Sequence, residues 1–188
     1  LYKSKGTNVV WFLDSLVNGN LKSLKEFAEG VIERGLKIKW AGYARCDERM
    51  DLEYLKLLNK SGCFILKIGA ESASNNVLSD MSKRMTREIM DKNFSDFNKA
   101  GIGVVTTWIN GFPTEKTIDH KSTLTFLCRN RNTIVGAASA SGFTIYAENI
   151  VGQNPERFGV ANFTYDMNWI RDDFSFGKPH MLCRVKNY

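Results

Sequence analysis

Short apolar runs alternate along the chain with longer segments whose apolar residues recur every three or four positions. The runs are rich in Val, Ile and aromatic residues, a composition typical of buried strands. They predict strands over residues 8–14, 36–44, 63–70, 102–110 and within 133–147. Each of the first four runs is followed by a segment with helical period, so strands and helices are expected to alternate.

Start and stop signals mark the helical segments. Asp51 and Thr86 stand at N-cap positions, and Gly35, Gly62 and Gly101 follow the last apolar position of a segment. These signals predict helices over about residues 21–34, 52–61, 75–81, 87–100 and 117–129.

This order predicts an α/β fold with a parallel sheet and right-handed crossovers. About five βα units lie within residues 1–148, too few for a closed eight-stranded barrel. An open, partial (βα) TIM-like barrel or a doubly wound sheet is therefore expected. Residues 149–188 lack the repeat, and we expect an irregular C-terminal extension that packs on the barrel.

Polar residues stand where the predicted strands end. Carboxyl ends of parallel strands form the ligand-binding edge in such folds. The candidate residues at these ends are Asp14, Arg45, Asp47, Glu71, Ser72, Ser74 and Tyr146. Because neighbouring parallel strands end at the same edge, we expect Asp14, Arg45 and Glu71 to converge on one rim.

Lys67 shares a strand face with Glu71, one layer deeper, because side chains alternate along a strand. An unpaired buried charge is costly, so its simplest role is to pair with an inward carboxylate. A barrel aldolase would instead use it as a Schiff-base lysine. Against that alternative, the sequence offers no clear proton-shuttling Tyr or His one layer away, and His120 and His180 lie in a predicted helix and in the extension.

A tight loop, GFPTE, follows the fourth predicted strand at Gly111 to Glu115. Its glycine allows close approach of the backbone, and its proline fixes a turn. Such a loop can present backbone N–H and C=O groups to a flat ring.

Charge and cysteine content narrow the function classes. The formal net charge is +6 and the isoelectric point is near 9.1, which permits an anionic ligand or a nucleic acid. The charges are scattered, so a solvated surface is favoured and nucleic-acid binding is not expected. Cys46, Cys63, Cys128 and Cys183 show no metal-binding spacing, and so cysteine-poor a chain predicts reduced thiols in the cytoplasm.

No apolar run approaches the roughly 20 residues of a membrane span, so no membrane association is expected. The first residues, LYKSKGTN, contain no signal-peptide core and no initiator Met. We therefore expect the chain to be part of a longer protein.

Taken in order, four motifs resemble the radical S-adenosylmethionine superfamily, in particular the Fe–S oxidoreductase-like branch often fused to a cobalamin-binding domain. They are ARCD at the end of the second strand, ESAS at the end of the third, VLSDMSK, and WINGFPTE. The resemblance covers about the first two thirds of the chain. It implies an open (βα)6 barrel, a [4Fe–4S] cluster, and cleavage of S-adenosylmethionine to a 5′-deoxyadenosyl radical that abstracts hydrogen from a substrate.

The resemblance also implies roles for individual residues. Glu71 would bind the methionyl amino group or the ribose, and Ser72 and Ser74 would bind nearby polar atoms. Lys83 would pair with the methionyl carboxylate or a local acid, and Arg45 would lie near the carboxylate or the substrate. The remaining assignments are the adenine contacts Ile109 and Gly111 and the substrate-side residues Asp14, Asp47, Lys67 and Tyr146.

One departure from the family is decisive for activity: the CxxxCxxC loop is absent. The first predicted strand aligns with the second strand of the family, so residues 1–148 would supply its second to sixth strands. We expect the cluster loop, with cobalamin as a candidate further cofactor, upstream in the same polypeptide, and no turnover from this chain alone. A cluster-less barrel that binds S-adenosylmethionine or another small ligand without catalysis remains an alternative.

Overall fold

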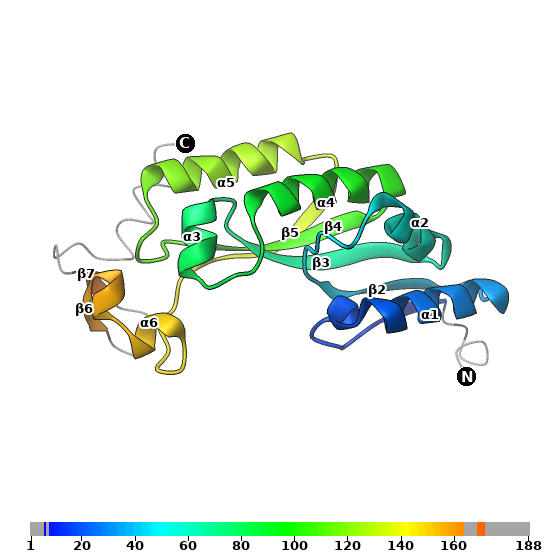
Figure 1. Ribbon diagram of the computed structural model, residues 1–188, viewed down its shortest axis with the longest axis horizontal. Coiled ribbons are helices and arrows are strands. Elements are labelled where there is room, and N and C mark those ends of the chain that lie inside the picture. Colours follow the sequence, from blue (N-terminus) through cyan, green and yellow to red (C-terminus); the bar gives the residue numbers. More distant parts are fainter. Residues whose placement is uncertain (1–5, 7, 164–168, 172–188) are drawn as a thin grey trace. The chain divides into compact units, whose positions relative to one another are not determined.

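The structure, a computed structural model, describes Gly6 and residues 8–163 and 169–171. Strands and helices alternate as expected (Figure 1). The strands are β1 (Val9–Trp11), β2 (Lys39–Ala44), β3 (Cys63–Glu71), β4 (Gly103–Asn110) and β5 (Ile134–Gly142). The main helices are α1 (Leu21–Glu33), α2 (Leu52–Lys60), α3 (Asn75–Asp80), α4 (Arg87–Ala100) and α5 (Thr117–Arg129).

The five strands form one sheet in the order β1-β2-β3-β4-β5. β1 pairs in parallel with β2, and β2 in parallel with β3, with Tyr43 opposite Lys67. Sequential order with parallel pairing is the arrangement of a (βα) barrel wall. Within the described residues β1 and β5 are the two edges, so the sheet is open, which confirms the predicted partial barrel.

Contacts between residues divide the chain into two compact units. Unit 1 comprises Leu1–Ala70, Arg87–Thr107 and Phe126–Ala138. Unit 2 comprises Glu71–Thr86, Trp108–Thr125 and Ser139–Tyr188. The boundary between the units crosses three strands, because β3, β4 and β5 each contribute residues to both units.

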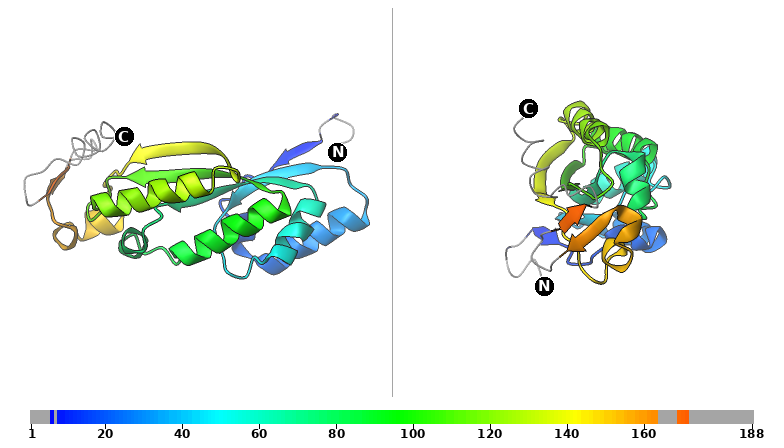
Figure 2. Two further views of the ribbon diagram at one scale, coloured as in Figure 1. Left: turned by 90° about the horizontal axis from the view of Figure 1, so that it is seen from above. Right: turned by 90° about the vertical axis from the view of Figure 1, so that its left-hand side faces the viewer.

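In unit 1, α1, α2 and α4 lie on one side of the strands (Figure 2, left). The buried positions of α1, Leu24, Ala28 and Val31, recur at helical spacing and explain why this segment packs on the sheet. Trp40 is fully buried; its indole N–H donates to the Ser61 hydroxyl (3.0 Å).

The predicted helix signals at the start and end of α2 are confirmed. The Asp51 carboxylate accepts a hydrogen bond from the Tyr54 N–H at the start of α2 (2.8 Å). Gly62, after α2, has a φ of 103°, and a Cβ there would lie 2.0 Å from the Ile38 carbonyl oxygen, so only glycine fits. The sequence reasoning missed Asn20, whose side chain caps α1.

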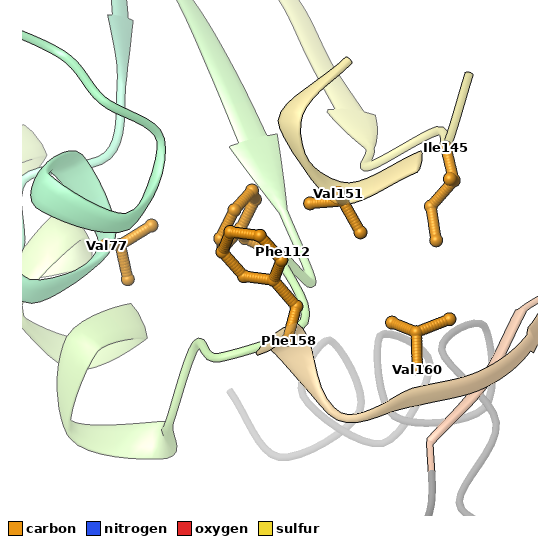
Figure 3. Close-up of a cluster of buried hydrophobic side chains, with 6 residues drawn as sticks. All are labelled: Val77, Phe112, Ile145, Val151, Phe158 and Val160. Carbon is orange, nitrogen blue, oxygen red and sulfur yellow. The ribbon is translucent and has the colours of Figure 1, made fainter. Parts of the chain in front are cut away.

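Unit 2 has its own hydrophobic core, drawn in Figure 3. Its buried members are Val77, Phe112, Ile145, Val151, Phe158 and Val160. The ring of Phe112, from the GFPTE loop, packs edge-on against Phe143 and Phe158, with centroids 4.8 and 5.7 Å away. This loop is therefore anchored by its aromatic residue.

Short elements occur within the predicted C-terminal extension. They are α6 (Ile150–Gln153), the 3-10 turn η3 (Glu156–Phe158), and the antiparallel pair β6 (Val160–Phe163) and β7 (Trp169–Arg171). Another 3-10 turn, η2 (Val17–Gly19), precedes α1. Residues 172–188, with Cys183 and His180, lie outside the described residues, and the boundary at residue 148 stays a prediction.

None of the helices described here combines the length and the apolar character needed to cross a membrane.

Candidate functional site

Strand β3 ends on a residue with an unusual backbone. Glu71 has a φ of 61°, in the left-handed region that side chains other than glycine rarely adopt. Among the described residues only one further non-glycine residue, Ser82 (φ 56°), shares this conformation. Such strain costs on the order of 1–3 kcal/mol and persists only where the surrounding structure imposes it.

Ser82 lies at the end of α3 and turns the chain back. The Lys83 N–H donates to the Leu78 carbonyl (2.9 Å) and the Ser82 N–H to that of Ser79 (2.9 Å). The first of these bonds spans six residues, as in a Schellman motif, whose left-handed position is usually a glycine.

The two left-handed positions flank an ion pair. The Lys83 Nζ lies 3.7 Å from Glu71 Oε1, and the two side chains are 42% and 16% exposed, respectively. The distance exceeds that of a direct charge-assisted hydrogen bond, so the two charges face each other without being locked together. A carboxylate and an ammonium side by side are complementary to a zwitterionic amino acid group.

The serines after Glu71 are buried and bonded to α5. The Ser74 hydroxyl donates to Asp119 Oδ1 (2.6 Å), and the Ser72 hydroxyl accepts from the Ser74 N–H (3.2 Å). The Ala73 N–H donates to the Thr123 hydroxyl (3.0 Å). These bonds fix the loop beside Glu71; binding of a cofactor by Ser72 and Ser74 stays a prediction.

The sequence reasoning missed Asp119 and Thr123 as supports of this loop. Their signal was two polar residues four apart, on one face of the predicted helix. Asp119 also accepts from the Lys116 N–H (2.8 Å) near the start of α5.

The GFPTE loop is held by its own glutamate. Gly111 has a φ of 74°, and its N–H donates to Glu115 Oε2 (2.6 Å). Glu115 is 2% exposed, its N–H donates to the Phe112 carbonyl (2.8 Å), and its other oxygen lies 3.8 Å from His120 Nδ1. The Thr114 hydroxyl bonds to Asp80, which ties the loop to α3.

Ile109 is half-buried. The adenine contacts assigned to Ile109 and Gly111 stay predictions. The N–H of Gly111 already donates to Glu115, so of its backbone polar groups the carbonyl would be the one to meet a ring.

Arg45 and Asp47 belong to unit 1. The Asp47 carboxylate accepts two hydrogen bonds from the Arg49 guanidinium (2.9 and 2.7 Å), and Arg45 lies 3.9 Å away. These bonds lower the pKa of Asp47 to about 2. Asn18, fully buried, bonds both the N–H (3.1 Å) and the carbonyl (2.8 Å) of Arg45 and so fixes the end of β2.

The other predicted substrate-side residues belong to both units. Asp14 is exposed in unit 1, and Tyr146 is exposed in unit 2. Lys67 forms no ion pair with a described residue; its Nζ lies 4.8 Å from the centroid of the Tyr43 ring and 3.5 Å from the Tyr43 hydroxyl. The convergence of Asp14, Arg45 and Glu71 on one rim stays a prediction.

The described residues do not fit an iron–sulfur cluster. No group of three or more His, Cys, Asp or Glu side chains in this part of the chain could hold a metal ion. Burial raises the pKa of the Cys46 thiol to about 12 and that of Cys63 as well, so neither provides a thiolate at neutral pH.

Comparisons with known proteins give no match to any protein-family model. An uncharacterized methyltransferase of Pyrococcus horikoshii is 25% identical over 126 residues, covering 67% of this chain and 27% of the relative. The bacteriochlorophyllide d C-12(1)-methyltransferase of Chlorobaculum tepidum is 26% identical over 121 residues, covering 64% of this chain and 26% of that protein. The chain thus spans about a quarter of the length of the curated relatives it matches.

Solved structures share the fold. The radical S-adenosylmethionine methyltransferase TsrM of Kitasatospora setae, solved with cobalamin and a [4Fe-4S] cluster, matches with a TM-score of 0.70 at 15% identity, over 80% of this chain and 31% of that chain. The cobalamin-dependent S-adenosylmethionine radical enzyme OxsB matches with a TM-score of 0.58 at 17% identity, over 96% and 28%. Coproporphyrinogen III oxidase of Escherichia coli, a radical SAM enzyme, gives 0.53 at 13% identity, over 68% and 30%. The chain therefore shares the partial α/β fold of these radical S-adenosylmethionine enzymes, which is the fold that the resemblance of its motifs predicted.

Proposed function

We propose that the chain is the part of a radical S-adenosylmethionine enzyme that binds S-adenosylmethionine, with Glu71 as its principal ligand. The observation that carries this proposal is the left-handed backbone of Glu71 next to the ion pair with Lys83. Backbone strain of this kind gathers at ligand-binding sites, where a side chain must point in a direction that the regular strand would not give it.

The charges of this pair suit the methionyl end of S-adenosylmethionine. The Glu71 carboxylate would accept hydrogen bonds from its ammonium group, and the Lys83 ammonium would attract its carboxylate. The Asp119 and Thr123 side chains would keep the loop after Glu71 in place through the bonds to Ser74 and Ala73. When bound next to a reduced [4Fe–4S] cluster, the cofactor supplies a 5′-deoxyadenosyl radical for hydrogen abstraction.

Another part of the same polypeptide would hold the cluster, since the described residues do not fit one. Support comes from the curated relatives, which are about four times as long as the matched segment. Both relatives are named methyltransferases, and TsrM and OxsB bind cobalamin. These names favour methyl transfer as the overall reaction and cobalamin as the further cofactor.

The test is the affinity for S-adenosylmethionine of the full-length, anaerobically reconstituted protein, measured by equilibrium dialysis. Glu71→Gln keeps the shape of the side chain and removes its charge, and should weaken binding by about tenfold or more. Glu53→Gln is the matched control, because Glu53 forms an ion pair with Lys56 on the surface of α2. An unchanged affinity in Glu71→Gln would remove the site, and binding without 5′-deoxyadenosine formation would favour a binding module without catalysis.

A second candidate, the Schiff-base aldolase, gains one observation from the structure. The register of β2 and β3 places Tyr43 directly opposite Lys67 and brings its hydroxyl to 3.5 Å from Lys67 Nζ, a neighbour that the sequence reasoning did not identify. Borohydride trapping with a carbonyl substrate distinguishes the candidates, since a covalent adduct on Lys67 is expected only for the aldolase.

A further inference from the structure

In the part of the chain that the structure describes, helices cover only one face of the sheet in unit 1 (Figure 2, left). Buried and half-buried residues alternate strictly from Leu66 to Ala70 and from Gly103 to Thr107. The buried set faces α1, α2 and α4, which lie on one side of the strands (Figure 2, left). Parallel sheets are normally covered on both faces. We therefore expect a ligand or further protein to cover the face that the helices leave open.

Two aromatic side chains and two lysines lie on this open face: Lys39, opposite Val9, is exposed, whereas Lys67 is half-buried. Trp11 is opposite Ala41, Ala41 opposite Ile65, and Tyr43 opposite Lys67, which puts all of them on the same side. The Trp11 ring meets the Tyr43 ring edge-on (5.9 Å, 86°), and the Lys67 ammonium lies over the Tyr43 ring. The three side chains form one contiguous cluster, the Lys67 cluster.

The surroundings of the Lys67 cluster are apolar. Val9 is 50% exposed and Trp11 is 43% exposed on β1, and Val135 is 59% exposed on β5. A Cβ on Gly103 would lie 3.1 Å from Val135 and 3.5 Å from Ile65, which places these residues on the open face. Among the described residues of this face, Lys67 is the half-buried ammonium within the apolar surface, and Lys39 is exposed near Val9.

Lys67 is short of negative charge. Within the described residues every other half-buried or buried charged side chain of β2, β3 and their loops has an ionic partner, as Asp47 has with Arg49 and Glu71 with Lys83. The π face and the hydroxyl of Tyr43 attract a cation but do not neutralise it. A half-buried ammonium of this kind favours an anion that enters with a ligand.

We propose that the Lys67 cluster binds a small molecule with a carboxylate on a flat, apolar body. The carboxylate would meet the Lys67 ammonium and the Tyr43 hydroxyl, and the body would lie on Trp11 and the neighbouring apolar side chains. The Lys67 cluster lies within unit 1 and does not include Glu71, so its ligand can be tested without S-adenosylmethionine. If this ligand is also the substrate of the radical enzyme, that further role rests on the proposed function; binding itself does not.

The experiment uses 2-naphthoate as the probe and its neutral amide, 2-naphthamide, as the matched ligand. Each is titrated calorimetrically into the full-length protein without S-adenosylmethionine. Saturable binding of 2-naphthoate is expected, about tenfold tighter than that of the amide and weakened by salt. Lys67→Met should remove the preference for the acid, whereas Lys60→Met, at an exposed lysine of α2, should keep it. Trp11→Leu should weaken both ligands.

Three results would overturn the proposal: no saturable binding of 2-naphthoate, equal affinity for acid and amide in the unchanged protein, or an undiminished preference for the acid in Lys67→Met. The comparison of acid and amide needs no variant, so it decides the matter even where Lys67→Met does not fold. Loss of S-adenosylmethionine binding in Glu71→Gln with 2-naphthoate binding intact would separate this site from the proposed function.

Discussion

The Lys83 ammonium lies 3.7 Å from the Glu71 carboxylate, and a left-handed backbone position stands on each side of this contact, at Glu71 itself and at Ser82. The energies decide what this arrangement is for. A partly exposed ion pair contributes at most about 1 kcal/mol, whereas the two backbone positions together cost more than that, at about 1–3 kcal/mol each. The pair therefore does not offset the strain, and binding of a ligand is the better explanation of the geometry.

The strain at Glu71 predicts an inverted order of stability. Glycine adopts a φ of 61° without a Cβ clash, so Glu71→Gly should be more stable than Glu71→Ala by about 1 kcal/mol, although glycine normally destabilises a strand. Urea unfolding of the two variants measures the difference. A more stable alanine variant would show that the residue is not strained.

Ser82 offers a matched test within the same site. Ser82→Gly should raise the free energy of unfolding by about 0.5–1 kcal/mol, because a Schellman motif favours glycine at its left-handed position. Ser95→Gly, at an exposed position inside α4, should lower it by a few tenths of a kcal/mol. Equal effects of the two substitutions would contradict the assignment of the motif.

Asp47 gives unit 1 an acid-sensitive contact. Hydrogen bonds from Arg49 lower the pKa of Asp47 from 3.8 to about 2, so its ionised form stabilises the fold above pH 4. Because the Arg49 side chain is exposed and solvent screens the pair, this contribution is at most about 1 kcal/mol. Because the folded-state pKa is the lower one, this contribution is lost as the pH falls from 4 towards 2. Asp47→Asn should therefore be less stable than the unchanged protein at pH 6, and the gap should narrow towards pH 2.5 in urea unfolding. Glu53→Gln is the control, and a gap that does not depend on pH would refute the role of the Asp47 charge.

The cysteines should differ sharply in reactivity. Cys46 and Cys63 are buried and burial raises the pKa of both thiols, whereas Cys128 is exposed on α5. Iodoacetamide at pH 7.5 should modify Cys128 in the folded protein and reach Cys46 and Cys63 only in urea, as read by peptide mass spectrometry. Rapid labelling of Cys46 without denaturant would show that the end of β2 opens readily.

The alternation of strands and helices was predictable because each period is a local property of the chain. Asp51 and Gly62 were identified for the same reason, since a cap and a left-handed stop depend on neighbouring residues. The contact between Tyr43 and Lys67 was missed, because it depends on the register of two strands and a shift between Trp40 and Ala41. The structural role of the buried Asn18 was also missed. Its amide bonds the backbone of Arg45, 27 residues away, and nothing in the local sequence shows this contact.

The left-handed backbone of Glu71 and Ser82 was invisible in the sequence, because both residue types normally avoid it. Positions that break a local rule are expected at functional sites. The sequence did single out Glu71 and Lys83, but through the resemblance of their motifs rather than through geometry.

The two-unit organisation has a spectroscopic consequence. Trp40, which is fully buried, lies in unit 1, and Trp108, which is 3% exposed, lies in unit 2. Each unit therefore carries an indole shielded from water, whose fluorescence should shift to longer wavelength when that unit opens. Proteins that retain only one of the two indoles would show whether the halves melt together or in succession.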